Sequence, residues 1–265
     1  MLPRFHVGDE LALRIGAVCT LPEGTSRHIQ VLRMQPGGQV QLFDGGGKEW
    51  LASVTEMGRK LVTVRIDAAV EQARELPVRV TLAMGMPAND RMDALIEKAA
   101  ELGVYAIQPL MCERSVLRLD GERAAKKVAH WQAVAVAACE QCGRSVVPRV
   151  HPVMALTAWL TASSAQGAAQ DDAAVRRGVL SLREAMSLPA WMRADDSEDG
   201  LAPAAQISTG LSYVFLSGPE GGLSPCEEQA ALDAGWTAIT LGPRVLRADT
   251  APLAALSVIG SAYER

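Results

Sequence analysis

Two glycine-containing segments near the end of the chain have residue types that bind ligands through the backbone. The first is Ser217-Gly-Pro-Glu-Gly-Gly-Leu-Ser224, in which three glycines let the main chain approach a ligand and expose its N–H groups. The second is Leu241-Gly-Pro-Arg-Val-Leu-Arg-Ala-Asp-Thr250. Its apolar pair Val245-Leu246 lies between two arginines, which is unusual in an exposed loop. We therefore expect this pair to line a pocket.

Each segment is expected to follow a strand and to precede a helix, where open α/β sheets bind their ligands. Strand patterns cover Tyr213–Leu216 and Thr237–Leu241, and helical patterns begin at Ser224 and near Asp249. Ser224-Pro-Cys-Glu227 has the pattern of a capping box with proline at the first helical position. Neither segment matches G-x-G-x-x-G, which argues against a dinucleotide fold. An ordinary strand-to-helix turn is the alternative for the first segment.

The elements that must position these segments suggest two domains. Short strand patterns separated by glycine-rich turns predict a small β-barrel at the start of the chain; they lie at Val18–Thr20, Gln39–Phe43, Trp50–Val54 and Leu61–Ile66. A polar, alanine-rich connection follows, so we place a boundary near residue 72 and expect domains at 1–72 and 73–265. Beyond it, strand and helix patterns alternate, as is typical of an α/β domain with a parallel sheet.

The expected order in the second domain is a strand at Val78–Met84, a helix capped by Asn89 or Asp90 that ends at Gly103, and a strand at Val104–Leu110. A long helix from about Glu122 has a repeating apolar stripe: Ala124, Val128, Trp131, Ala135, Ala138 and Cys142. Residues 161–210 are of low complexity, apart from an apolar island at Gly178–Glu184 that we expect to form a strand. The last helix is expected to end at Tyr263.

Composition indicates a cytoplasmic protein with a large core, since 49% of its 265 residues are hydrophobic and no apolar run reaches membrane-spanning length. The net charge of −4 argues weakly against a nucleic-acid partner. However, residues 1–150 carry 19 Lys and Arg against 17 Asp and Glu, while residues 151–265 carry 7 against 13. This asymmetry is compatible with RNA contact through the N-terminal part.

Cysteine and histidine chemistry is weakly supported. The five cysteines form no paired framework, so we expect reduced thiols. Pro225-Cys226 is similar to the pair in enzymes that methylate a pyrimidine carbon through a cysteine adduct, but helix capping also explains it. Cys139 and Cys142 have C-x-x-C spacing within a helical stripe, which favours packing over zinc. No metal spacing connects the histidines, and we expect no metal.

The two loops together resemble the paired C-terminal motifs of RsmE-type 16S rRNA (uracil-N3) methyltransferases, members of the SPOUT class. Four further segments resemble that family in order and spacing: Arg27-His-Ile-Gln-Val-Leu-Arg33, Glu97-Lys-Ala-Ala-Glu-Leu-Gly-Val104, Pro109-Leu-Met-Cys-Glu-Arg-Ser115 and Glu140-Gln-Cys-Gly-Arg144. The similarity covers nearly the whole chain and is poor in the stretch 161–210. Asp249, where the family pattern has Glu, and Cys142, where it has Ser, are small departures.

The resemblance implies a PUA-like β-barrel followed by a SPOUT domain whose parallel sheet ends in a trefoil knot. It also implies S-adenosyl-L-methionine as cofactor, a homodimer, and a uridine of 16S rRNA in the small ribosomal subunit as substrate. Carried over by position, the cofactor-binding residues are Leu216, Ser217, Gly218, Glu220, Gly221, Gly222, Leu241, Gly242, Val245 and Leu246. The RNA-binding candidates are Arg4, His28, Arg33, Arg91, Lys98 and Arg144.

Methylation at uracil N3 requires the N3 proton to leave and the negative charge to spread over the flanking carbonyl oxygens. Cationic donors at those oxygens would favour the deprotonated base. Arg247 and Arg114 are the candidates for this catalytic role, and a phosphate contact or a surface ion pair is the alternative for each. Two other functions stay open: another SPOUT methyltransferase acting on the ribose 2′-hydroxyl or on tRNA, and a non-enzymatic RNA-binding ribosome assembly factor.

Overall fold

The computed structural model describes residues 2–8, 11, 13–72, 74–167, 175–194 and 211–263. The chain divides into two compact units. The first contains residues 1–75 together with Val136–Val147, and the second contains Leu76–Ala135 and Pro148–Arg265. The expected boundary near residue 72 stays a prediction, and no sequence pattern indicated that 136–147 would join the first unit.

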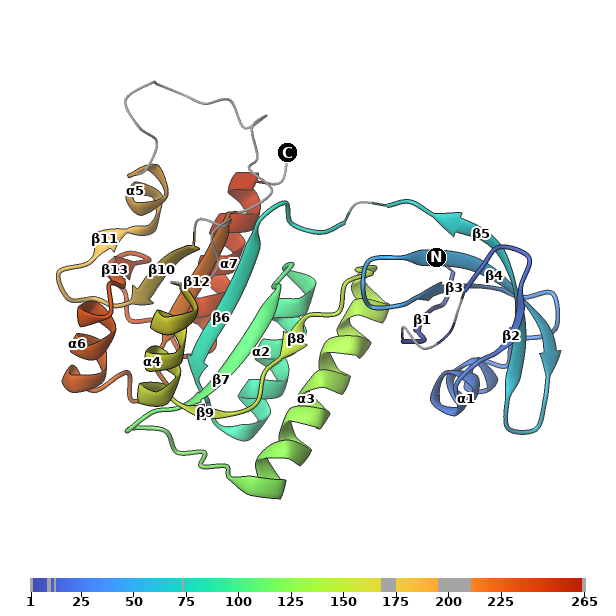
Figure 1. The fold of residues 1–265 in the computed structure, drawn as a ribbon, viewed down its shortest axis with the longest axis horizontal. Helices are drawn as coiled ribbons and strands as arrows, with labels where there is room; N and C mark the ends of the chain where they lie inside the picture. The colour runs from blue at the N-terminus through green and yellow to red at the C-terminus, as the bar shows by residue number, and fades with distance from the viewer. Residues whose placement is uncertain are drawn as a thin grey trace. The chain divides into compact units, whose positions relative to one another are not determined.

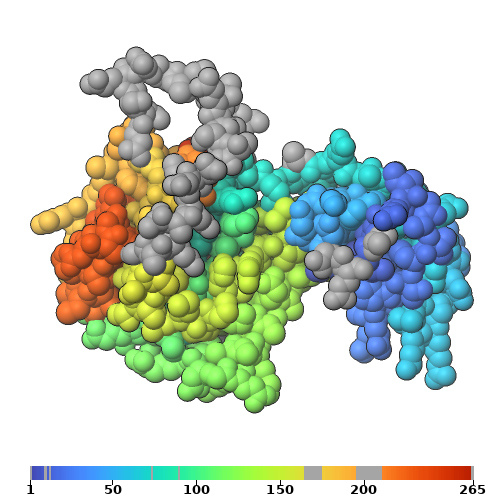
Figure 2. Space-filling view, viewed as in Figure 1, coloured from blue at the N-terminus to red at the C-terminus, as the bar shows by residue number. Residues whose placement is uncertain are grey.

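A five-stranded, mostly antiparallel sheet forms the first unit, drawn in blue in Figures 1 and 2. Its order is β1-β3-β4-β5-β2, and the strands are β1 (Arg4–His6), β2 (Val18–Thr20), β3 (Gln39–Phe43), β4 (Glu49–Met57) and β5 (Val62–Val70). Register shifts within the β4–β5 pair bend the sheet as bulges do. The helix α1 (Glu23–Val31) belongs to the same unit. Alternate residues of β4 and β5 fill its core, including Val54, Val64 and Ile66.

Residues 136–147 are fastened into the first unit by polar contacts. Arg144 pairs with Glu75 at 2.5 Å. The backbone N–H of His6 donates to Glu140 at 2.9 Å, and that of Val147 donates to Gly45 O at 3.0 Å. These residues lie in or just after the last turns of α3 (Gly121–Cys142). The unit is therefore built from two separate stretches of the chain.

The second unit is built on an eight-stranded sheet in which every pairing is parallel. The order is β11-β13-β10-β12-β6-β7-β8, with β9 paired to β7. The strands are β6 (Arg79–Gly85), β7 (Ala106–Met111), β8 (Arg149–Val150), β9 (Met154–Ala155), β10 (Val175–Leu180), β11 (Met186–Ser187), β12 (Ser212–Ser217) and β13 (Thr237–Thr240). β6, β7 and β12 are almost wholly buried, as expected for parallel strands covered on both faces.

Helices cover this sheet on two faces, with α4 in front of it and α7 behind it in Figure 1. α7 packs on β6, β12 and α2, whereas α4 and α6 pack together over β7 and β10. The helices are α2 (Asn89–Glu101), α4 (Leu156–Gly167), α5 (Leu188–Arg193), α6 (Pro225–Asp233) and α7 (Thr250–Tyr263). Within the described part of the chain, no helix has the length and apolar character needed to cross a lipid bilayer.

The α/β class with a parallel sheet is confirmed, and most elements lie where expected. Two details differ. The N-cap of α2 is Ala88, without a side-chain cap, instead of Asn89 or Asp90. The strand expected at Gly178–Glu184 begins at Val175 and ends at Leu180, because the chain turns there and Glu184 adopts a positive φ of 44°. Much of the stretch 161–210 lies outside the described residues. The trefoil knot stays a prediction.

Candidate functional site

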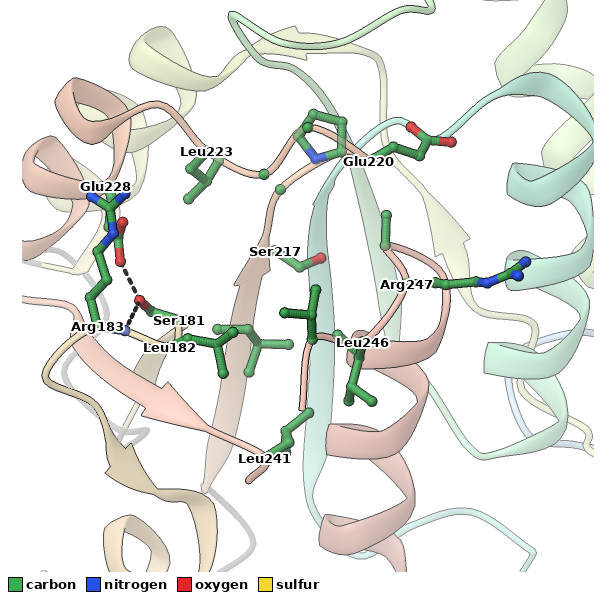
Figure 3. Close-up of a pocket in the computed structure, with 18 of the residues that line it drawn as sticks. Ser181, Leu182, Arg183, Ser217, Glu220, Leu223, Glu228, Leu241, Leu246 and Arg247 are labelled. Carbon is green, nitrogen blue, oxygen red and sulfur yellow. Dashed lines mark hydrogen bonds between the residues drawn. The ribbon is translucent and has the colours of Figure 1, made fainter. Parts of the chain in front are cut away.

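A cavity of about 590 Å³ lies at the carboxyl ends of β10, β12 and β13. Both segments singled out in the sequence line it: Ser217–Leu223 follows β12, and most of Leu241–Ala248 follows β13. β10 lies between β13 and β12 and pairs in parallel with both, so the carboxyl ends of the three strands meet at one edge of the sheet. Figure 3 shows Leu223 and Glu220 of the first loop at the top of the cavity, and Leu241, Leu246 and Arg247 of the second loop below them.

The first loop needs its glycines for close backbone packing. A Cβ on Gly218 would lie 2.5 Å from Leu223 N and 2.6 Å from Gly222 C. Gly222 adopts φ +68°, in the left-handed region. Gly85, at the end of β6, leaves room for Pro219, since a Cβ there would lie 2.4 Å from the proline Cδ. The loop therefore folds tightly on itself and on the neighbouring strand.

Three polar connections fasten the first loop to its neighbours. Glu220 accepts the backbone N–H of Ala88 at 2.9 Å, at the start of α2, and lies 3.8 Å from Arg91. The Nη1 of Arg114 donates to Gly221 O at 2.9 Å and to Leu223 O at 3.3 Å. Glu227 accepts Glu113 N at 2.7 Å and Ser224 N at 2.9 Å. Contacts within the protein thus fix the conformation of the first loop.

The capping box expected at Ser224 is present. The Ser224 hydroxyl accepts the backbone N–H of Glu227, whose carboxylate accepts that of Ser224 in return. Proline occupies the first turn of α6. Cys226 is exposed and is not among the residues that line the cavity, so the structure offers no support for a cysteine adduct there.

The second loop begins with a tight turn and ends by starting α7. Gly242 adopts φ +110°, and its backbone exchanges hydrogen bonds with the Thr240 hydroxyl. Arg247 O accepts the N–H groups of Thr250 and Ala251, which begin the helix. Val245 is 85% exposed although it lines the cavity. An apolar side chain this exposed at a cavity is available to a ligand or a partner.

A third loop, which the sequence did not indicate, lines the cavity after β10. The backbone N–H of Arg183 donates to the Ser181 hydroxyl at 3.0 Å, and that hydroxyl donates to Glu228 of α6. Figure 3 shows this group across the cavity from Glu220 and Arg247. The sequence contains one signal for this loop, because the apolar run ends at Leu180. A parallel strand that ends beside β12 places the residues that follow it at the same edge of the sheet.

Charge around the cavity differs in sign from the charge of the whole chain. Five arginines line it, Arg91, Arg114, Arg183, Arg244 and Arg247, against two glutamates, Glu220 and Glu228. The side chains of Arg244 and Arg247 have no ion-pair partner among the residues that the structure describes. Two exposed cations are therefore available at the cavity for an anionic ligand.

The buried thiols of Cys112 and Cys139 are held protonated. Burial, together with the negative charge of Glu227, raises the pKa of Cys112 to about 12. The pKa of Cys139 is also raised, by its hydrogen bond with Cys142 and by burial. A nucleophilic thiolate is disfavoured at both positions. Among the described residues, no group of three His, Cys, Asp or Glu side chains could hold a metal ion.

The residues proposed for the cofactor are brought together, with one exception. Leu216 does not line the cavity, because it is fully buried in the core cluster under the sheet with Val179 and Ala83. The other nine cofactor candidates line it, as do both catalytic candidates, Arg247 and Arg114. Arg114 is engaged with carbonyl groups of the first loop, which makes it a positioning residue. Binding by these residues stays a prediction.

Two of the RNA-binding predictions are wrong. The Arg4 guanidinium is buried and pairs with Glu49 at 2.5 Å, and Arg144 is buried against Glu75. Neither can reach a phosphate without breaking a buried pair. Lys98 hydrogen-bonds Glu101 and Glu97, which raise its pKa, and its contact with RNA stays a prediction.

The other three RNA-binding candidates differ in position. Arg91 lines the cavity, whereas His28 and Arg33 are exposed in the first unit. These three stay predictions.

Comparison with known proteins identifies the class to which the chain belongs. The model of an RNA methyltransferase domain matches residues 74–260, and that of an RNA methyltransferase PUA domain matches residues 21–67. Fold and site together thus define an RNA methyltransferase preceded by a PUA-like unit.

The similar proteins narrow the class. Ribosomal RNA small subunit methyltransferase E of Bacillus subtilis (strain 168) is 31% identical over 87% of this chain and 84% of its own length. The structure of a protein of the same name from Neisseria gonorrhoeae, bound to S-adenosyl methionine, has a TM-score of 0.82 and 35% identity, covering 99% of this chain and 98% of that one. A putative methyltransferase from Legionella pneumophila, in complex with the cofactor, has a TM-score of 0.82 at 31% identity, covering 99% and 98%. The chain belongs to the ribosomal RNA small subunit methyltransferase E family.

Proposed function

We propose that this protein transfers a methyl group from S-adenosyl-L-methionine to N3 of a uridine in 16S rRNA of the small ribosomal subunit. The observation that carries the proposal is that two loops about twenty residues apart line one cavity. One loop offers glycine backbone, and the other offers Arg244 and Arg247, which have no ion-pair partner in the described part of the chain. The first feature suits a nucleoside cofactor and the second an anionic substrate. The family membership supports both.

The residues at the cavity fit the cofactor in two respects. A Cβ at Gly218 would meet the backbone of Gly222 and Leu223, so the tight fold that brings the first loop to the cavity requires glycine there. The buried Ser217 hydroxyl has no protein partner among the described residues and is available to a ligand. When bound, the cofactor supplies an activated methyl group.

The chemistry left to the chain is to favour the uracil anion and to orient it. Arg247 is exposed at the cavity and its guanidinium has no ion-pair partner among the residues described, so it can donate to a uracil carbonyl oxygen as negative charge develops there. Arg114 acts indirectly, because its guanidinium holds the carbonyls of Gly221 and Leu223. Glu220 is similarly committed to the start of α2.

We also propose a homodimer in the cytoplasm. α7 is apolar along most of its length, and some of its apolar side chains, such as Leu253 and Val258, are only partly buried within the chain. Such a helix face is suited to pairing with a second copy.

The test is methyl transfer from labelled cofactor to small subunits that lack the modification, with the product nucleoside identified by mass spectrometry. The expected product is N3-methyluridine in 16S rRNA. A ribose-methylated nucleoside, or modification of tRNA alone, would support another SPOUT activity. Binding of subunits without any transfer would support a non-enzymatic assembly factor.

A further inference from the structure

The hydroxyl group of Ser217 differs from those of the other buried serines. The structure describes five buried serines, and Ser217 is 4% exposed. Ser26 donates to Leu21 O at 3.1 Å and accepts Val62 N at 3.0 Å. Ser115 and Ser224 accept backbone N–H groups, and Ser145 donates to a carbonyl. Ser217 Oγ alone among these five has no hydrogen-bond partner.

The unpaired hydroxyl faces the cavity. Ser217 is the last residue of β12, and it lines the cavity together with Gly218. Figure 3 shows its oxygen on the side of the strand that faces the segment carrying Leu246 and Arg247.

Burying a hydroxyl without a partner costs free energy, whereas a ligand that supplies the partner recovers it. A neutral hydroxyl is a weaker partner for a full charge than the arginines and glutamates that line the same cavity. The amino-acid half of the cofactor carries an ammonium and a carboxylate. The polar groups of the adenosine half are all uncharged.

We propose that the Ser217 hydroxyl hydrogen-bonds an uncharged polar atom of the adenosine half of the cofactor, and that this bond contributes to the selection of the cofactor. The inference rests on the proposed function, since it takes the cavity as the cofactor site. Its partner is either an edge of the adenine base or a ribose hydroxyl. The analogues in the test separate these two.

The test compares Ser217→Ala and Ser217→Cys with Ser26→Ala, a buried serine in the other unit. Titration calorimetry with S-adenosylhomocysteine should give a roughly three- to tenfold weaker affinity for both Ser217 variants, as expected for one neutral hydrogen bond. Ser26→Ala should bind normally. Without ligand, Ser217→Ala should melt at or above the wild-type temperature, whereas Ser26→Ala should melt below it, because only Ser26 loses bonds made within the protein.

A set of S-adenosylhomocysteine analogues identifies the partner atom, each lacking one polar atom of the base or one ribose hydroxyl. The loss caused by Ser217→Ala should disappear on the one analogue that lacks the partner. An unchanged affinity of Ser217→Ala, an equal loss on every analogue, or a melting temperature lowered as in Ser26→Ala would each overturn the inference. If the wild-type protein itself fails to bind S-adenosylhomocysteine, the proposed function fails instead.

Discussion

At the scale of single residues, two arginines at one cavity have different surroundings and should therefore have different roles. Arg114 bonds carbonyls of the first loop, whereas Arg247 has no ion-pair partner in the described part of the chain. Both were expected to contact the uracil. The sequence could not distinguish their roles, because both are arginines in loops. Only the structure shows which guanidinium bonds protein carbonyl groups and which is available to a substrate.

Arg247→Ala should lower the rate of methyl transfer at saturating subunit by roughly 10²- to 10³-fold, the range found when one preorganised donor is removed. Cofactor affinity should stay near that of the wild type, because the contact strengthens only as charge develops on the base. Single-turnover transfer and separate subunit binding measure the two effects. Arg123→Ala on α3, also exposed but away from the cavity, is the charge-matched control. An unchanged rate at saturation would make Arg247 a phosphate anchor.

Gly218→Ala should abolish cofactor binding, because the added Cβ would meet backbone atoms at 2.5 and 2.6 Å and no side chain can move to relieve the contact. Calorimetry with S-adenosylhomocysteine measures the loss. Gly24→Ala is the control, since a Cβ there meets nothing within 4 Å. Normal binding by Gly218→Ala would show that the first loop does not hold the cofactor.

At the scale of elements, the start of α6 connects helix capping to the site. The carboxylate of Glu227 accepts one N–H from its own helix cap and another from Glu113, in the loop after β7. One side chain thus fixes both the helix and the distance between two neighbouring loops. The capping box could be predicted from Ser224 and Glu227, but the bond to Glu113 could not, because it joins residues 114 positions apart.

Glu227→Gln should lower the free energy of unfolding by about 1–3 kcal/mol, since the amide offers one acceptor oxygen where the carboxylate offers two. Cofactor affinity should fall as well, because the first loop loses a support. Thermal melting and calorimetry measure the two effects. Glu122→Gln, exposed beside Lys126, should change neither. Full stability of Glu227→Gln would mean that the two N–H groups find other acceptors.

Elements with strong local patterns were predictable, and those that depend on distant residues were not. The strands β2 and β3 have the bounds expected from their patterns, since glycine-rich turns delimit them. The third cavity loop was missed because Ser181 and Arg183 gain their place only through pairing of β10 with β12. Arg4 and Arg144 were misassigned to RNA because a sequence does not show that Glu49 and Glu75 lie beside them.

At the scale of the whole molecule, the positive cavity rim coexists with a net charge of −4. Bulk electrostatics therefore cannot hold RNA, and the substrate must be recognised by a shaped surface. Naked 16S rRNA should accordingly be methylated much more slowly than an assembled small subunit at equal concentration. Initial rates on both substrates measure the difference. Equal rates would show that a local RNA segment is sufficient.

The homodimer should be detectable by light scattering at micromolar concentration as a mass of about twice the 28.2 kDa of one chain. Ser257, exposed in the middle of α7, provides a test of the pairing surface. Ser257→Arg should leave the monomer folded, because the side chain projects outward, and should shift the mass toward one chain. Thr161→Arg, at an exposed position of α4, is the control and should leave the mass unchanged. A monomeric wild type would contradict the proposal.

The discontinuity of the first unit has a consequence for the order in which a growing chain can fold. Residues 1–75 leave the ribosome well before 136–147, which supply Glu140 to His6 and Arg144 to Glu75. During that interval the sheet lacks these contacts. They can form only after β6, α2, β7 and most of α3 have been synthesised. An isolated fragment 1–75 should consequently be unstable, whereas addition of a peptide 136–147 in trans should increase its ordered strand signal in circular dichroism. The first unit therefore gains its last contacts only after much of the second unit has been translated. The order of translation thus couples the folding of the two units.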